Sequence, residues 1–130
     1  MNQLQTIAAP VARILLSLIF VTSGLSKISG YAATQGYMEA MGVPGALLPL
    51  VIAVELLGGL AVMLGWQTRI AAFLLAGFSL LSALLFHADF GDQMQMIMFM
   101  KNISIAGGFL IIVSLGSGSF ALDNRSSNGK

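Results

Sequence analysis

Long apolar stretches separated by short polar segments dominate the chain. Four of them approach the roughly 20 residues that a helix needs to cross about 30 Å of hydrocarbon. They cover approximately residues 7–28, 47–66, 70–87 and 96–115. The pattern predicts an all-α membrane protein in which residues 1–116 form a four-transmembrane-helix bundle. Residues 117–130 are rich in Ser, Gly and Asn, and we expect a flexible polar tail there because little apolar surface is available to bury.

The first apolar stretch has the length of a secretory signal but a different layout. Its charged residue, Arg13, lies inside the stretch instead of before it, and no small-residue cleavage site follows. We therefore expect a retained membrane anchor.

The connection between the first two stretches is the longest, at about residues 29–46. Within it, Thr34, Tyr37, Met38 and Met41 recur at helical spacing, and Gly and Pro follow as stop signals. Tyr favours the membrane–water interface. The pattern predicts a short interfacial helix over the mouth of the bundle, with an irregular loop as the alternative.

Composition supports lipid as the solvent. The 130 residues are 57% hydrophobic and only 8% charged, whereas a soluble domain carries about 25% charged residues. The net charge of +1 and the lack of a basic stripe argue against nucleic acid as a partner. The absence of cysteine excludes disulfides, thiol redox chemistry and thiolate metal sites.

Ionisable side chains inside the apolar stretches are the candidates for chemistry. Each costs roughly 2.5–3.5 kcal/mol to place in hydrocarbon, so such residues usually face the bundle interior. At about 1.5 Å per residue, four of them fall in the same half of the bundle, one from each stretch. With a neighbouring amide they form the candidate ligand pocket: Lys27, Glu55, His87, Lys101 and Asn102.

Arg13 is predicted to be a structural charge within the membrane. Arg13, Ser17, Phe20, Gly24 and Lys27 form one stripe on the first helix, so this stripe should face the other helices.

Glu55 is the only acidic residue deep in a stretch, and we expect it to pair with Lys27, Lys101 or Arg13. Two interpretations remain open for the cluster. Lysines and the histidine can extend to the interface while Glu55 only fixes helix register, or the groups can form a functional pocket.

Small residues indicate where helices approach closely. The predicted packing positions are Gly24, Gly58, Gly59, Gly107 and Gly108.

Four methionines alternate along residues 94–100, and thioethers suit Cu(I). Because the segment leads directly into an apolar stretch, we expect it to be helical, which spreads these side chains around the helix. No metal site is predicted.

Several motifs, in this order, resemble the DoxX family of small bacterial inner-membrane proteins over nearly the whole chain. They are Arg13 with Phe20, Gly24 and Lys27; Tyr37 and Met38; Gly42 and Pro44; Glu55 with Gly58 and Gly59; Gly65 with Thr68 and Arg69; His87 and Phe90; Phe99, Lys101 and Asn102 with Gly107 and Gly108; and Phe120 with Asp123.

The resemblance implies a membrane subunit linked to quinones or to oxidative stress, with a redox partner subunit. It implies no particular reaction, and the catalytic residues are unknown. The chain has no cysteine and only one histidine, so its side chains supply no redox chemistry unaided. We therefore expect no intrinsic cofactor, and electron transfer would require a bound quinone or a partner. The alternatives are a small-molecule transporter that works as a homo-oligomer, and an assembly factor or scaffold.

Orientation follows from the distribution of Lys and Arg near the ends of the spans. With four spans, both termini and the second connection lie on one side. That side carries Arg13, Arg69, Arg125 and Lys130, and the opposite side carries Lys27 and Lys101. The distribution therefore predicts cytoplasmic termini, and the resemblance implies that the membrane is the bacterial inner membrane.

Reporter fusions after Lys130 test this orientation. We expect a fused green fluorescent protein to fluoresce and a fused alkaline phosphatase to be inactive, because the phosphatase requires disulfides that form outside the cytoplasm. The reverse pair of results would overturn the orientation.

Overall fold

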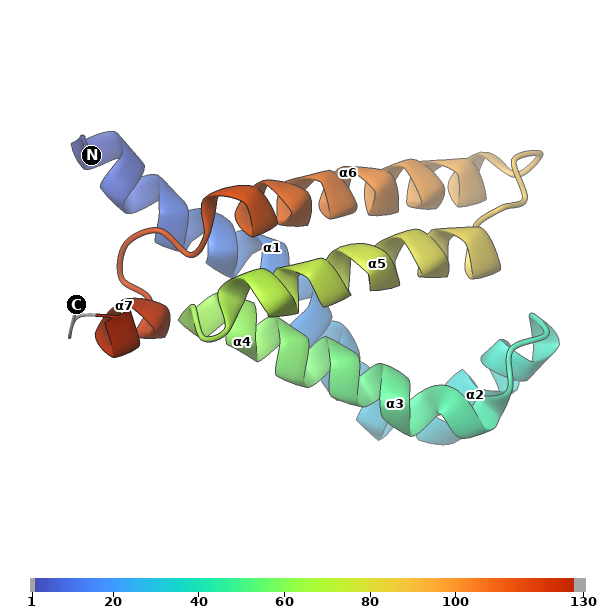
Figure 1. The fold of residues 1–130 in the computed structure, drawn as a ribbon. Helices are drawn as coiled ribbons and strands as arrows, with labels where there is room; N and C mark the ends of the chain where they lie inside the picture. Colours follow the sequence, from blue (N-terminus) through green and yellow to red (C-terminus); the bar gives the residue numbers. More distant parts are fainter. Residues whose placement is uncertain (1, 128–130) are drawn as a thin grey trace.

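The computed structural model describes residues 2–127, and these contain helices and turns but no strand (Figure 1). Four helical segments are long and apolar enough to cross a membrane, so the predicted fold class is confirmed. They are α1 (Gln3–Ser29), a composite segment over Gly45–Leu64, α5 (Thr68–Phe86) and α6 (Gln93–Leu115). The composite segment runs through η1 (Gly45–Leu47), α3 (Leu48–Ala53), η2 (Val54–Gly58) and α4 (Gly59–Leu64).

Polar caps explain why the helices begin before the apolar stretches that predicted them. At the start of α1, the backbone N–H of Gln5 donates to Asn2 Oδ1 at 2.8 Å, and the Asn2 N–H donates to Gln5 Oε1 at 3.0 Å. Asp92 Oδ1 accepts from the N–H of Met94 at 2.9 Å before α6. Such caps satisfy N–H groups that have no partner within the helix.

The predicted interfacial helix is present as α2 (Tyr31–Ala40). It lies at the end of the bundle opposite to α7 (Leu122–Ser127), which we call the α2 end (Figure 1). Gly42, with φ of +81°, and Pro44 follow it, as expected for stop signals.

The surface of the bundle is apolar on all four spans. Leu15, Leu57, Leu84 and Ile111 are between 60% and 68% exposed, each on a different span. Exposed side chains of this kind are suited to lipid.

The centre of the bundle is formed by Phe20, whose ring packs edge-on against two others. The ring centroids of Phe78 and Phe109 lie 6.3 and 5.5 Å from it, respectively. Leu75, Val62 and Phe109 are completely buried around this point. Residues from all four spans therefore meet in one small core.

Close helix contacts occur at four of the five predicted glycines. A Cβ atom would lie 2.6 Å from Leu56 Cγ at Gly24 and 3.0 Å from Val21 Cγ2 at Gly59. The corresponding contacts are Leu75 for Gly58 and Leu16 for Gly108, at 3.2 and 3.0 Å. These positions leave no room for a larger residue without a shift of the neighbour.

The prediction for Gly107 is wrong. No atom lies within 4 Å of its added Cβ, and the residue is exposed. A pair of glycines in sequence points in directions about 100° apart on a helix, so only Gly108 faces α1.

The segment after α6 packs against the bundle, in contrast to the flexible tail that its composition predicts. Arg13 Nη1 donates to the Met63 carbonyl at 3.0 Å, and Nη2 donates to the Ser119 and Phe120 carbonyls, both at 2.8 Å. Arg13 is only 2% exposed. It thus joins α1 to the end of α4 and to residues 116–121, which we call the strap. Residues 128–130 of the predicted tail, including Lys130, lie outside the described residues.

Asp123, just after the strap, binds the start of α5. Its carboxylate accepts from the N–H groups of Gln67 and Thr68 at 2.7 and 3.0 Å, and from Thr68 Oγ1 at 2.6 Å. Partial burial raises the pKa of Asp123, but these hydrogen bonds and the charge of Arg13 outweigh it, so the pKa lies below its ordinary 3.8.

Asp123→Ala is expected to destabilise the protein by about 1 kcal/mol, the typical value of a helix cap. Because the folded-state pKa lies below 3.8, the carboxylate contribution is complete above this pH and is lost as pH falls through the folded-state value. Thermal unfolding in detergent should therefore give a lower unfolding temperature for the variant than for wild type at pH 7. The difference between the two temperatures should decrease below pH 3.8. Asp89→Ala, in the exposed turn before α6, serves as the control. Equal effects of both variants would contradict the capping role.

Candidate functional site

A cavity of about 560 Å³ lies in the half of the bundle toward the α2 end. In Figure 1, α3 separates from α5 toward this end, while α5 and α6 remain packed together. The cavity is lined by residues of α1, α2, the composite segment, α5 and α6. It includes all five residues that the sequence predicted to form a pocket: Lys27, Glu55, His87, Lys101 and Asn102.

Glu55 lies on the only π-helical turn among the described residues, η2. Such a turn contains one extra residue compared with an α-helix and is frequent at functional sites. It interrupts an otherwise continuous helix between α3 and α4. Glu55 is 4% exposed and lines the cavity, so the turn places a carboxylate at depth in an apolar environment.

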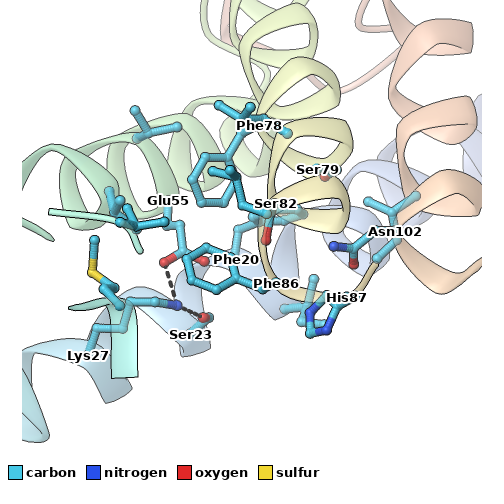
Figure 2. Close-up of a pocket in the computed structure, with 18 of the residues that line it drawn as sticks. Phe20, Ser23, Lys27, Glu55, Phe78, Ser79, Ser82, Phe86, His87 and Asn102 are labelled. Carbon is cyan, nitrogen blue, oxygen red and sulfur yellow. Dashed lines mark hydrogen bonds and ion pairs between the residues drawn. The ribbon is translucent and has the colours of Figure 1, made fainter. Parts of the chain in front are cut away.

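The expected pairing of Glu55 with a cation from another helix is confirmed for Lys27. Lys27 Nζ lies 2.8 Å from Glu55 Oε1 and donates a hydrogen bond to Ser23 Oγ at 2.6 Å (Figure 2). The side chains are 25% and 5% exposed, respectively. The ion pair connects α1 to η2, and its attraction is strong because little water surrounds the carboxylate.

Arg13, another predicted partner of Glu55, has a different role. Its guanidinium bonds to carbonyl groups of Met63, Ser119 and Phe120 at the far end of the bundle. It therefore fits the structural charge that the sequence predicted, and it does not supply the cation of the cavity.

The opposite wall of the cavity carries polar groups from α5 and α6. Ser79 is 2% exposed, and its hydroxyl has no hydrogen-bond partner among the described residues. Asn102 projects from α6 toward the space that Glu55 faces from the other side (Figure 2). A buried hydroxyl without a partner is costly, and Ser79 is one of the residues that line the cavity.

Ser23 and Ser79 were not among the predicted site residues. Ser23 precedes Lys27 by four residues, one helical turn, and this spacing could have identified it. Ser79 is a small polar residue in an apolar stretch and resembles many serines that only contact their own helix backbone. Its lack of a partner is a property of the packing alone.

His87 and Lys101 lie on the same cavity but are less buried. His87 Nδ1 is 2.8 Å from Gln95 Oε1, a contact that joins the end of α5 to the first turns of α6. Lys101 is partly exposed and lines the cavity from α6.

Aromatic and apolar side chains form the rest of the walls. Tyr37 of α2 stacks on Phe86 of α5, with ring centroids 5.6 Å apart and an angle of 22° between the planes. Met38, also of α2, is 4% exposed and lines the cavity. Helix α2 therefore covers the cavity at the α2 end. Apolar walls with a few convergent polar groups are typical of small-molecule sites.

The methionine segment is helical, as expected, because α6 begins at Gln93. Met98 lines the cavity, whereas Met94, Met96 and Met100 are exposed. Within residues 2–127, no group of three or more His, Asp or Glu side chains has a geometry that could hold a metal ion.

Comparisons with known proteins agree with the resemblance in the motifs. A family model described as DoxX matches residues 8–88. The chain is 51% identical over 123 residues to "Inner membrane protein YqjF" of Escherichia coli, with 95% of each chain covered. It is 38% identical over 122 residues to "Inner membrane protein YphA" of the same organism, with 88% of this chain and 87% of the relative covered.

A more distant relative has a name that mentions an activity. The chain is 34% identical over 76 residues to "Putative oxidoreductase CatD" of Bacillus subtilis, with 58% of this chain and 57% of that protein covered. No solved structure matches the chain significantly.

Removal of the carboxylate tests the energetics of the ion pair. Glu55→Ala leaves Lys27 without its counterion, and we expect a loss of roughly 3 kcal/mol in the free energy of unfolding. Combining Glu55→Leu with Lys27→Met should restore most of this stability, because apolar residues of similar volume often replace a buried pair without loss. Unfolding in mixed micelles measures both, with Glu39→Ala on the exposed face of α2 as the control. A double variant that loses as much as the two single changes together would contradict the pairing.

Proposed function

Since the chain belongs to the DoxX family of membrane proteins, we propose that it binds a quinone-type head group in the cavity at the α2 end. In this proposal the protein is a ligand-binding subunit of a membrane redox or oxidative-stress system. It resides in the bacterial inner membrane with both termini in the cytoplasm. The names of the two Escherichia coli relatives support this location.

The observation that supports the proposal most is the meeting of buried and partly buried polar groups from opposite walls of an apolar cavity. Glu55 and Lys27 come from one side, and Ser79 and Asn102 from the other. A membrane protein gains nothing in packing from such groups, because each must leave water. Their convergence on one cavity therefore favours a ligand that is itself polar at its head.

The chemistry of a quinone matches this arrangement. A benzoquinone is a flat apolar ring with two carbonyl oxygens at opposite ends, and each oxygen accepts hydrogen bonds. Lys27 Nζ has three N–H groups; one donates to Ser23 and the ammonium group forms an ion pair with Glu55, which leaves donor capacity on the α1 side. In this proposal the unpaired hydroxyl of Ser79, which lines the cavity, turns toward the ligand and acts as a donor on the α5 side. Phe20, Phe78 and Phe86 provide surfaces for the ring.

A redox role requires electrons from another protein. The sequence contains no cysteine and a single histidine, so its own side chains provide neither a thiol pair nor two haem-type ligands. The protein would hold the quinone head while a partner subunit exchanges electrons with it. The name of the Bacillus subtilis relative, which covers 58% of this chain, supports a link to an oxidoreductase.

Binding of decylubiquinone to the protein in nanodiscs tests the proposal. We expect Ser79→Ala and Glu55→Gln each to weaken binding about tenfold, since each removes one hydrogen-bonding or charged group from the site. Ser104→Ala is the matched control, because Ser104 is an exposed serine of α6 that does not line the cavity.

The same preparation separates the alternatives. Wild-type protein that binds no quinone, or variants that bind as tightly as wild type, would contradict the proposal. Ligand uptake into liposomes would then favour a transporter, and a stoichiometric partner protein without any bound small molecule would favour a scaffold.

A further inference from the structure

One side of the cavity reaches the lipid-facing surface between α3 and α5. Leu50 of α3 and Leu74 and Leu81 of α5 line the cavity, yet they are 61%, 57% and 56% exposed. Residues that both line a cavity and remain exposed lie at its opening. All three are apolar, so this opening, which we call the lateral mouth, faces hydrocarbon in a bilayer.

Gly77 makes a gap in the α5 rim of the lateral mouth. It lines the cavity between Leu74 and Leu81 in sequence, it is exposed, and no atom lies within 4 Å of the position where its Cβ would be. Unlike Gly24 or Gly59, it therefore does not serve close packing between helices. The missing side chain leaves open space at Gly77, whereas the side chains of Leu74 and Leu81 occupy the positions on either side of it.

Helix α2 crosses the end of the cavity nearest the aqueous phase. Tyr37 of this helix stacks on Phe86 and is 47% exposed, while Met38 and the following Val43 are buried at 4% and 9% exposure. Molecules dissolved in water thus meet a helix at this end, whereas molecules dissolved in the bilayer meet the apolar lateral mouth.

We propose that the ligand of this cavity carries an apolar chain that lies in the lateral mouth beside Gly77. This inference rests on the proposed function, and it defines the substrate class as lipid-soluble molecules with a polar head and a hydrocarbon tail. The head lies against Glu55 and Ser79, the buried polar groups, and the tail leaves the protein between Leu50 and Leu81. Gly77 is the residue that determines acceptance of the tail.

Two benzoquinones with the same head group test the position of the tail. Decylubiquinone has a ten-carbon chain, and 2,3-dimethoxy-5-methyl-1,4-benzoquinone has none. We expect Gly77→Leu to weaken binding of the tailed compound about tenfold or more, because added methylene groups overpack an occupied space. Binding of the tailless compound should remain unchanged. Dissociation constants are measured in nanodiscs and calculated from the quinone concentration within the lipid.

Gly107→Leu is the matched control. Gly107 is also an exposed helical glycine with no atom within 4 Å of its added Cβ, but it does not line the cavity. We expect both quinones to bind this variant as they bind wild type. Equal weakening of both compounds by Gly77→Leu, or no weakening of either, would overturn the position of the tail.

Chemical labelling tests the lateral mouth independently of any quinone. The chain lacks cysteine, so Ser79→Cys introduces a single thiol at the inner wall of the cavity. We expect N-ethylmaleimide, which enters membranes, to label this thiol in vesicles, and a charged methanethiosulfonate to leave it unmodified from either side. Adding Gly77→Leu should slow the labelling and adding Gly107→Leu should not. Rapid labelling by the charged reagent would overturn access from the lipid, whereas lack of quinone binding with correct labelling would overturn only the proposed function.

Discussion

The hydrogen bonds of Arg13 are the interaction on which the arrangement of the helices depends. A helix end leaves backbone carbonyls without partners, and hydrocarbon provides no water to satisfy them. The guanidinium bonds to the Met63 carbonyl at the end of α4 and to Ser119 and Phe120 of the strap. The negative end of the α4 dipole and these carbonyls stabilise a cation that would otherwise be expensive to bury. One side chain of α1 thereby fixes the second span and the segment after the fourth at the same end.

Because the hydrogen bonds of Arg13 hold the helices together at the end near α7, the helices can separate at the α2 end. Phe20 forms the middle of the core, and beyond it α3 moves away from α5 toward the α2 end (Figure 1). The ion pair between Lys27 and Glu55 spans α1 and η2 in this part and holds them together without filling the space. The π-helical turn orients the Glu55 carboxylate toward Lys27. The backbone hydrogen bonds of this turn differ from the regular α-helical pattern. The cavity is therefore a consequence of a bundle that is tied at one end and joined by a charged pair in the other half.

The polar groups of the cavity differ in whether they have a hydrogen-bond or ion-pair partner within the protein. Glu55 has its counterion, whereas the hydroxyl of Ser79 has no partner among residues 2–127. A site that served only to fix helix register would have no need of the second group, since a buried unsatisfied hydroxyl destabilises the fold. The cavity thus has polar groups at its inner wall and an apolar opening, the lateral mouth beside Gly77. This combination is suited to molecules that themselves reside in the bilayer.

The sequence by itself determined the four spans, because hydropathy over about 20 residues is a local property that the bilayer thickness imposes. It also determined that Lys27 and Glu55 share one half of the bundle, because depth along a helix follows from residue count. Only the tertiary structure decided which cation pairs with Glu55, that Asp123 fixes a segment whose composition predicts flexibility, and that Ser79 lacks a partner. Arg13 lies on the same helix stripe as Lys27, and the sequence could not distinguish their roles. Partner choice depends on helix rotation, crossing and the path of the chain after α6, which contacts between distant residues set and no local pattern encodes.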